Sequence, residues 1–292
     1  MLGIVTIDYK NPQMTIDFVC RELPKIDVQY ICVIVINDCT EEELNLIRKG
    51  TGGIVVGKEV GKKTNIYIIP SPENLGFAKG NNFGVKFLEE NFDCDYFLFT
   101  NTDIEIKSDV NVSKMIACLE KIKQIGAIGP KVISLDGSVQ HPHEKIISPY
   151  RQIGWHLLPF FKRKRTVVCN RNFNLDEEQE AKFCYWVQGS FFIIKASVFN
   201  RIGYFDPHTF LYAEEQILAE KLKQIGKRMY YYPDVTVLHY EGGTILKENS
   251  NYRSLYMAME SNCYYYRKYL HYNPFVVWLY KYTFMLNRKI FK

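Results

Sequence analysis

The chain has no cysteine pattern of the kind that binds zinc or carries out redox exchange. Its eight cysteines are scattered over 292 residues, and no two of them form a Cys-x-x-Cys pair. Several lie inside apolar runs, such as Cys32 within residues 31–34. We therefore expect free, buried thiols, which persist in a reducing compartment, and hence a cytoplasmic protein.

Long apolar runs are missing as well. The apolar clusters at residues 157–161 and 275–280 are much shorter than the roughly 18–20 residues of a membrane-spanning helix. The first residues show no charged segment followed by an apolar stretch, so we expect no signal peptide.

Glycine motifs for nucleotide phosphates are absent too. Gly76 and Gly80 form neither the Gly-x-Gly-x-x-Gly pattern nor the Walker pattern, so a Rossmann or P-loop site is not supported. Charge is nearly balanced, with 37 basic and 32 acidic residues and a formal net charge of +5. No recognised nucleic-acid-binding motif accompanies the basic residues, and we expect no nucleic-acid partner.

Basic residues do gather in two places, each beside an apolar cluster. The run Lys-Arg-Lys-Arg at 162–165 follows residues 157–161, and Arg288 and Lys289 follow residues 275–280. Basic and aromatic residues together are one footprint of a protein that contacts an anionic membrane face. A solvated surface explains them equally well. Peripheral contact with the inner face of the cytoplasmic membrane is therefore one of two expectations.

What the sequence does contain is a regular alternation of strand-like and helix-like segments in its first half. Residues 2–7, 31–36, 66–69 and 96–99 are apolar runs, and apolar residues recur at helical spacing between them. This order predicts right-handed βαβ units and an α/β fold with a mostly parallel central sheet flanked by helices. Residues from about 250 onward are rich in tyrosine and predict a helical extension.

One of these runs ends abruptly in polar residues. Residues 96–99 (Tyr-Phe-Leu-Phe) lead directly to Asn101, Thr102 and Asp103. In an open α/β sheet, ligands bind beyond the carboxyl ends of the strands, which is where Asp103 would lie. A carboxylate beside a phosphate-bearing ligand is a usual way to hold Mg²⁺ or Mn²⁺. These residue types are also ordinary turn formers, so a turn without a ligand is the alternative.

Polar residues follow the neighbouring strands in the same way. Asp8 comes after the first apolar run, and Asn37 and Asp38 come after the second. The carboxyl ends of parallel strands meet at one edge of a sheet. We therefore expect Asp8, Asn37, Asp38, Asn101 and Asp103 to converge there on a nucleotide.

Two further segments carry position-specific signals. Residues 186–195 predict a strand, and the glycine of Gly189-Ser190 inside it often marks the close approach of a ligand or of another backbone. Residues 74–82 open a predicted helix whose apolar residues, Phe83 among them, are expected to face inward.

The second half also offers candidates for catalysis. A helix predicted over 214–225 begins on Glu214 and Glu215, and a short strand over 235–238 ends on His239. A carboxylate can serve as a general base and a histidine as a metal ligand. Glutamates in a first helical turn are also favoured by the helix dipole, and a histidine after a strand is often structural.

Several of these segments match family motifs in order along the chain. Residues 74–82 (Asn-Leu-Gly-Phe-Ala-Lys-Gly-Asn-Asn) fit the signature Asn-x-Gly-Phe-x-x-x-x-Asn, and residues 101–103 fit the Asn-x-Asp form of a DxD metal motif. Residues 203–206 followed by 210–215 are similar to a Gly-x-Phe-Asp…Tyr-x-Glu-Asp block. In this the chain resembles the family 2 glycosyltransferases with the GT-A fold, particularly the rhamnosyltransferase-like branch.

The resemblance implies an organisation and a set of site residues. Residues 1–245 would form a GT-A-type nucleotide-diphospho-sugar transferase fold, with a donor nucleotide-binding half at 1–105, an acceptor-side half at 106–245 and a helical, Tyr-rich extension at 246–292. The donor would contact Asp8, Tyr9, Asn37, Asp38, Asn74, Gly76, Phe77, Lys79, Asn82 and Asn101. The acceptor side would include Trp186, Gly189 and Ser190. Asp103 and His239 would hold Mg²⁺ or Mn²⁺, and Glu215 would be the base, with Glu214 as its alternative.

The chain departs from the family pattern in three places. Asn37-Asp38 inverts the usual Asp-Asn order, and Glu215 stands where the family has aspartate. Asn101 supplies an amide where a full DxD motif has a carboxylate. Because an amide is a weaker ligand, we expect metal binding to depend on the diphosphate and on His239.

The function implied by the resemblance is inverting, metal-dependent transfer of a sugar in cell-surface polysaccharide synthesis. The donor would be a UDP- or dTDP-sugar, and the acceptor a hydroxyl of a saccharide, free or lipid-linked. Two alternatives stay open. A nucleotidyltransferase would be expected to carry a Gly-rich basic loop after the first strand, and a non-catalytic module would bind a saccharide or a partner protein. The sequence predicts no oligomeric state.

Overall fold

The computed structural model describes residues 1–57, 64–107, 111–157, 180–240 and 251–290. The basic run 162–165 lies outside the described residues, as do the side chains of Arg288 and Lys289. The surface that these basic residues were predicted to form therefore stays a prediction.

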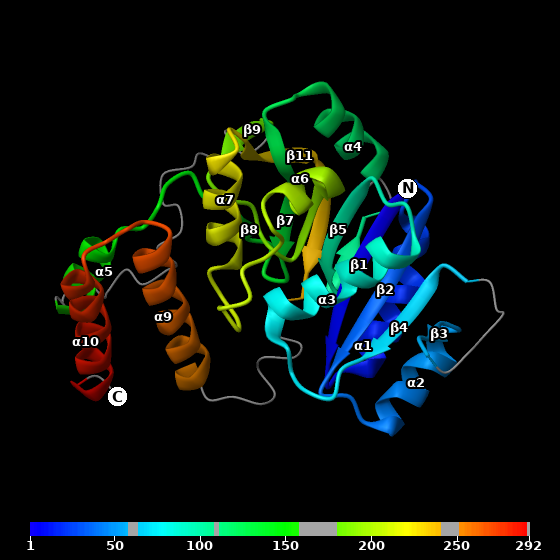
Figure 1. Cartoon of the computed structure of the whole chain (residues 1–292), viewed down its shortest axis with the longest axis horizontal. Helices are drawn as coiled ribbons and strands as arrows, with labels where there is room; N and C mark the ends of the chain where they lie inside the picture. The colour runs from blue at the N-terminus through cyan, green and yellow to red at the C-terminus, as the bar shows by residue number, and fades with distance from the viewer. Residues whose placement is uncertain (58–63, 108–110, 158–179, 241–250, 291–292) are drawn as a thin grey trace.

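The described strands form one mixed sheet (Figure 1). They are β1 (Leu2–Tyr9), β2 (Tyr30–Asn37), β3 (Ile54–Val55), β4 (Ile66–Pro70), β5 (Tyr96–Asn101), β6 (Ile104–Ile106), β7 (Ile125–Ser134), β8 (Val139–Gln140), β9 (Lys182–Cys184), β10 (Phe191–Lys195) and β11 (Arg228–His239). Their order is β3-β4-β2-β1-β5-β10-β7-β11-β6, with β8 paired to β7 and β9 paired to β11.

The first half of the chain builds the parallel part of the sheet. β1 pairs in parallel with β2 and β5, and β4 pairs in parallel with β2 and β3. Phe97, Leu98 and Phe99 of β5 are completely buried, as expected for a strand that is covered on both faces. The parallel sheet predicted for this half is confirmed.

The second half adds strands of both directions. β10 lies between β5 and β7 and runs antiparallel to both, whereas β11 is parallel to β7 and antiparallel to β6. Phe191, the first residue of β10, pairs with Thr100 near the end of β5. The reversed strand therefore brings Gly189 and Ser190 to the sheet edge where β5 ends.

Helices cover both faces of the sheet and add a third layer (Figure 1). They are α1 (Pro12–Asp17), α2 (Glu41–Thr51), α3 (Gly76–Asn91), α4 (Val112–Lys121), α5 (Pro149–Leu157), α6 (Ala196–Arg201), α7 (Glu214–Gln224), α9 (Asn251–Lys268) and α10 (Pro274–Ile290). Leu44 of α2 and Met115 of α4 belong to the core on one face of the sheet. Leu88 of α3, Phe199 of α6 and Leu222 of α7 belong to the core on the other face.

Helices α5, α9 and α10 make a separate bundle beside α7, which we call the C-terminal layer (Figure 1). Its core includes Ile153 of α5, Met259 and Tyr266 of α9, and Tyr280 of α10. The predicted helical extension is thus present, but α5 joins it from the middle of the chain. Among the described helices, none combines the length and the hydropathy that are needed to cross a bilayer.

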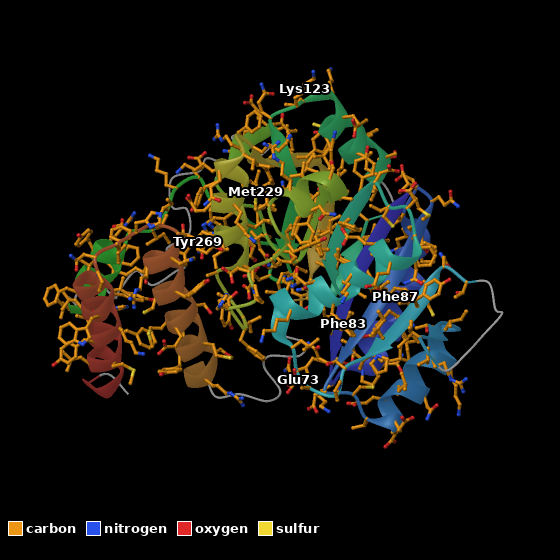
Figure 2. The ribbon with its side chains drawn as sticks, viewed as in Figure 1. Glu73, Phe83, Phe87, Lys123, Met229 and Tyr269 are labelled. Carbon is orange, nitrogen blue, oxygen red and sulfur yellow. The ribbon has the colours of Figure 1, made fainter. Side chains whose placement is uncertain are left out.

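Some local predictions are wrong. Phe83 is 39% exposed (Figure 2) because it lies on the solvent side of α3, whereas Leu88 faces the core. The strand predicted over 186–195 is shorter, since β10 begins at Phe191, and the strand predicted over 235–238 is the end of the longer β11. The described cysteines are unpaired as expected, although Cys20 is exposed rather than buried.

Candidate functional site

The ends of the parallel strands meet at one edge of the sheet, as predicted. Tyr9 pairs with Asn37 across β1 and β2, and Ile7 pairs with Asn101 across β1 and β5. The backbone N–H of Asn101 also donates to the carbonyl of Ser190, at 3.0 Å. Residues from both halves of the chain therefore lie along this carboxyl edge.

Asp103 and His239 form the candidate metal corner of this edge. Asp103 lies in the turn between β5 and β6, and His239 is the last residue of β11. Their register brings them together, because His239 pairs with Ile104 and the N–H of Tyr240 donates to the Asp103 carbonyl. Asp103 Oδ1 lies 3.2 Å from His239 Nε2, and both side chains are 14% exposed.

The donor set at this corner fits a divalent cation. The buried Asp103 Oδ1 has no hydrogen bond of good geometry within the described residues. The Gln140 side-chain amide contacts the other ring nitrogen of His239, Nδ1, at 3.2 Å, and a partner of this kind fixes the orientation of a metal-binding imidazole. Across the described residues, no cluster of three or more acidic, histidine or cysteine ligands is found. Two protein ligands suit a metal that takes its remaining ligands from substrate phosphates and water.

Glu214 and Glu215 lie at the first turn of α7, after a strained stretch of backbone. Tyr212 and Ala213 both have positive φ angles, of 75° and 68°, which costs a non-glycine residue of the order of 1–2 kcal/mol. Strain of this kind persists where the surrounding structure fixes it, and it is common at functional sites. The N-terminus of the helix also favours negative charge at both glutamates.

Glu215 is held by the backbone of Gly189. The N–H of Gly189 donates to Glu215 Oε1 at 3.1 Å. A Cβ atom at position 189 would lie 2.3 Å from the same oxygen, so only glycine permits this approach. The glycine predicted to admit a ligand or another backbone thus admits a carboxylate of the chain itself.

Burial raises the pKa of both glutamates. For Glu214, which is 5% exposed, the negative charge of Glu215 raises the pKa further. For Glu215, the hydrogen bond from Gly189 opposes the effect of burial. Oε1 of Glu214 is buried and has no hydrogen-bond partner among the described residues. Two adjacent carboxyls of this kind tend to share a proton.

The glutamate pair and the metal corner are linked through the backbone. Glu215 contacts Gly189, the next residue, Ser190, bonds to Asn101, and Asp103 follows two residues later. Oγ of Ser190 is buried and has no partner among the described residues. The two predicted centres of chemistry are therefore brought to one edge of the sheet.

Asp8 also lies at this edge and is buried. Its Oδ1 accepts a hydrogen bond from the Thr15 hydroxyl, and its Oδ2 has no partner in the described part of the chain. Burial raises the pKa of Asp8 to about 6, although the bond from Thr15 opposes the shift. A buried oxygen of this kind is available to a ligand hydroxyl.

Other predicted donor residues are engaged within the protein. Asn37 Nδ2 donates to the side-chain oxygen of Asn74 at 3.2 Å, and the N–H of Gly76 donates to the same oxygen at 3.0 Å. Asp38 is instead exposed and pairs with the Lys10 ammonium at 3.2 Å. The first three residues thus shape the loop before α3, and only Asp38 is open to solvent.

Gly76, Phe77 and Asn82 tie α3 to the 205–210 segment. Asn82 exchanges two hydrogen bonds with the backbone of Phe205, one to its carbonyl at 2.9 Å and one from its N–H at 3.0 Å. The N–H of Phe77 donates to the Phe210 carbonyl, and a Cβ atom on Gly76 would lie 2.1 Å from that oxygen. The Asn-x-Gly-Phe signature is therefore engaged in holding the two halves together.

Asp206 continues this tie toward the C-terminal layer. Its Oδ2 accepts from the hydroxyls of Tyr264 and Tyr269 of α9 (Figure 2), and its Oδ1 accepts from the backbone N–H of His208. We call the contacts of Asn82 and Asp206 the clamp.

The remaining predicted residues occupy less informative places. Lys79 is exposed on α3, and Tyr9 is half-buried at the end of β1. Trp186 lies in the loop before β10, where its ring stacks on that of His143 at 3.5 Å. Direct contact of any of the predicted residues with a ligand stays a prediction.

Some residues at the site carried no sequence signal. Gln140, which contacts His239, and Thr15, which bonds to Asp8, belong to no motif. The antiparallel pairing of β8 with β7 brings Gln140 near the edge. A larger hollow of about 430 Å³ lies at the amino ends of β2 and β4, lined by residues such as Gln29 and Asn65, and we place the site at the opposite edge because ligands bind at carboxyl ends.

No family model matches the chain. In sequence it is 25% identical over 186 residues to the N-acetylglucosaminyl-diphospho-decaprenol L-rhamnosyltransferase of Mycobacterium tuberculosis, covering 61% of this chain and 59% of the relative. It is 24% identical over 169 residues to the rhamnosyltransferase WbbL of Escherichia coli, covering 56% and 61%. The chain thus spans about three-fifths of the length of these curated relatives.

In structure the chain is similar to GalNAc-T7 crystallised with UDP, GalNAc and Mn²⁺. The TM-score is 0.60 at 14% identity, over 92% of this chain and 48% of the other. The chain therefore has the GT-A glycosyltransferase fold, and the predicted fold class is confirmed. Together with the sequence relatives, this confirms the resemblance to family 2 glycosyltransferases of the rhamnosyltransferase-like branch.

Proposed function

We propose that this protein is an inverting glycosyltransferase that moves a sugar from a nucleotide-diphosphate donor to a hydroxyl of a saccharide acceptor. The observation that carries the proposal is the position of Asp103 and Glu215 at one sheet edge, linked through Gly189, Ser190 and Asn101. A donor and a general base are both needed at such a site. The relatives that transfer rhamnose support the same reaction class.

The donor would lie along the carboxyl edge of the sheet. Asp8 would accept a hydrogen bond from the nucleoside, since its Oδ2 is buried and free of hydrogen bonds within the described residues. Asp103 and His239 would hold Mg²⁺ or Mn²⁺, which supplies positive charge that stabilises the leaving diphosphate. The Mn²⁺ in the GalNAc-T7 structure supports a metal in this role.

Glu215 would act as the base. Its carboxylate takes the proton of the acceptor hydroxyl, whose oxygen bonds to the anomeric carbon as the bond to the diphosphate breaks. The electron pair of that bond leaves on the nucleoside diphosphate, so the anomeric configuration is inverted. Glu214 is the more deeply buried of the two, and its raised pKa favours the protonated form, which lets Glu215 carry the charge.

The acceptor would be a saccharide on a lipid carrier, in the synthesis of a cell-surface polysaccharide. The decaprenol-linked substrate in the name of the mycobacterial relative supports this choice. The C-terminal layer offers a surface for such a lipid. Phe275, Trp278 and Tyr282 form a stacked row on α10, with exposures of 64%, 54% and 51%.

Charge on the C-terminal layer suits an anionic bilayer. Its exposed basic side chains include Arg151, Arg253, Arg267 and Lys268. Aromatic rings with adjacent basic groups bind the interface of anionic membranes. We therefore propose a cytoplasmic protein that contacts the inner membrane face.

Membrane contact predicts that the protein sediments with phosphatidylglycerol vesicles at low salt and is released at high salt. Trp278→Ala should weaken this binding several-fold. Phe83→Ala, which removes an exposed aromatic ring from α3, is the matched control and should leave binding unchanged. Equal loss in both variants, or no binding at all, would remove the membrane from the proposal.

The function itself is tested by a panel of UDP- and dTDP-sugars with and without Mn²⁺. Release of nucleoside diphosphate that depends on Mn²⁺ is the expected result. Release of pyrophosphate would indicate a nucleotidyltransferase instead. Saccharide binding without any turnover would indicate a non-catalytic module.

A further inference from the structure

A cavity of about 140 Å³ lies between the main body of the protein and the C-terminal layer. It is lined by the loop that contains Trp186, by the start of α7 at Gln216, and by Asn262 and Tyr265 of α9. At about 30 Å³ for each water, the cavity holds roughly five waters, which is comparable to much of one sugar ring. It is therefore large enough for part of a saccharide.

One wall of the cavity carries a polar atom that has no partner. Gln216 Oε1 is buried, and within the described residues no donor lies in hydrogen-bond range of it. Leaving a buried acceptor unsatisfied costs about 1–3 kcal/mol. Such an atom is expected to bind a ligand that brings a donor.

The other walls are rigid and aromatic. The Trp186 ring stacks on His143, with an interplanar angle of 10°, and His143 forms backbone hydrogen bonds with the Trp186 strand. Tyr185, beside Trp186, donates to the buried carboxylate of Glu220 of α7 at 2.7 Å and contacts the hydroxyl of Tyr265. Flat aromatic surfaces with fixed polar groups suit the alternating apolar and polar faces of a sugar.

The lining also limits the charge of an occupant. Lys145 at the rim is exposed, and the lining contains no carboxylate. Burial lowers the pKa of His143 to about 4, so this ring is neutral near pH 7. An occupant that presents hydroxyl donors to Gln216 satisfies the cavity better than an anion, which would place an acceptor against an acceptor.

The cavity borders the glutamate pair. Gln216 follows Glu215 directly, and Trp186 precedes Gly189, whose N–H holds Glu215, by three residues. The C-terminal layer supports the same corner, because Ser261 of α9 donates to the carbonyl of Leu211 just before the strained turn into α7. A sugar in the cavity would therefore lie next to the proposed base.

We propose that this cavity is the acceptor subsite, in which Gln216 accepts a hydrogen bond from a hydroxyl of a neutral sugar ring and thereby positions that sugar beside Glu215. The proposal rests on the proposed glycosyl transfer. It makes Gln216 a positioning and specificity-determining residue. It also makes α9 part of the active site, since Asn262 and Tyr265 line the same space.

The test is binding of methyl hexopyranosides, including those of glucose, galactose, rhamnose and N-acetylglucosamine, to the full chain by saturation-transfer NMR. At least one glycoside should bind the wild-type protein, and Gln216→Ala should weaken it roughly tenfold, which corresponds to one hydrogen bond. Gln224→Ala, at the exposed far end of the same helix, is the matched control and should bind as the wild type does. Binding of the nucleotide sugar by Gln216→Ala should be unchanged.

The outcomes separate this subsite from the proposed function. Nucleotide-sugar binding with glycoside binding that Gln216→Ala leaves unchanged would overturn the subsite and leave the transferase proposal standing. The absence of glycoside binding to a wild type that binds nucleotide sugar would do the same. Glycoside binding that depends on Gln216, in a protein that binds no nucleotide sugar, would support the subsite and overturn the transferase.

Discussion

The clamp and the carboxyl edge treat polar side chains in opposite ways. In the clamp, Asn82 exchanges two hydrogen bonds with Phe205, and both oxygens of Asp206 have donors. At the edge, polar oxygens are buried without hydrogen-bond partners among the described residues: Asp8 Oδ2, Asp103 Oδ1, Ser190 Oγ, Glu214 Oε1 and Gln216 Oε1. Buried polar groups in native proteins are normally satisfied, so the edge is the region prepared for a ligand.

This difference divides motifs that a sequence comparison treats alike. The Asn-x-Gly-Phe signature and the Asn-x-Asp motif both resemble family patterns. Yet the first is occupied by contacts between the halves of the chain, whereas the second ends in a carboxylate with unused capacity. We infer that the signature at 74–82 preserves the shape of the site and that Asp103 takes part in the chemistry.

The largest expected effect is the loss of turnover on removing the edge carboxylate. Asp103→Ala should lower nucleoside diphosphate release by about 10³-fold, because the metal loses a ligand where charge develops. Thermal unfolding should be nearly unchanged, since no hydrogen bond of good geometry is lost. Full turnover with Mn²⁺ present would refute the role of Asp103 in holding metal.

The glutamate pair should separate binding from transfer. Glu215→Gln should retain donor binding by calorimetry and lose transfer by roughly 10²–10⁴-fold, since the amide cannot take the acceptor proton. Glu214→Gln is the matched comparison and should lose less. If Glu214→Gln abolishes transfer and Glu215→Gln does not, the base has been assigned to the wrong residue.

In the clamp, a substitution should lower stability rather than chemistry. Asn82→Ala should lower the free energy of unfolding by about 2 kcal/mol, because the N–H and carbonyl of Phe205 lose their partner. Asn91→Ala, on the exposed end of the same helix, removes one bond to Phe87 and should cost less than about 1 kcal/mol. Denaturant unfolding measures both, and turnover per folded molecule should be preserved. A loss of turnover without loss of stability in Asn82→Ala would place this residue in the donor site.

The smallest expected effect is a pH dependence carried by Asp206. Burial raises its pKa, but hydrogen bonds from Tyr269, His208 and Tyr264 outweigh burial and lower the pKa to about 2 from 3.8. A carboxyl with a depressed pKa stabilises the fold above about pH 4, and this contribution disappears as pH falls through about 2. Asp206→Asn should therefore be less stable than the wild type by about 2 kcal/mol near pH 7, with the difference shrinking below pH 4. A difference that is constant from pH 7 to pH 2 would show that the charge of Asp206 is not what matters.

The sequence predicted the features that local pattern controls. Uninterrupted apolar runs located the parallel strands, and the polar residues after them converge as expected, because the register of parallel strands aligns their ends. The glutamates at the start of α7 and the end of β11 at His239 were located in the same way. These features depend on a few consecutive residues.

The features that were not predicted depend on contacts between distant residues. Nothing near Phe191 indicates that β10 runs antiparallel between β5 and β7, yet this reversal brings Gly189 to the edge. The packing of α5 with α10 rests on pairs such as Asn287 with the carbonyl of His156. The hydrogen bonds of Asn82 span more than a hundred residues, so its structural role has no signature in the local sequence.

The difference between edge and clamp is tested most directly by calorimetry of nucleotide-sugar binding with and without Mn²⁺. The wild type and Asp206→Asn should bind a UDP- or dTDP-sugar saturably and only when Mn²⁺ is present, and Asp103→Ala should lose this binding. Equal binding by Asp103→Ala and the wild type, or binding that does not depend on the metal, would contradict the assignment of the carboxyl edge as the donor and metal site.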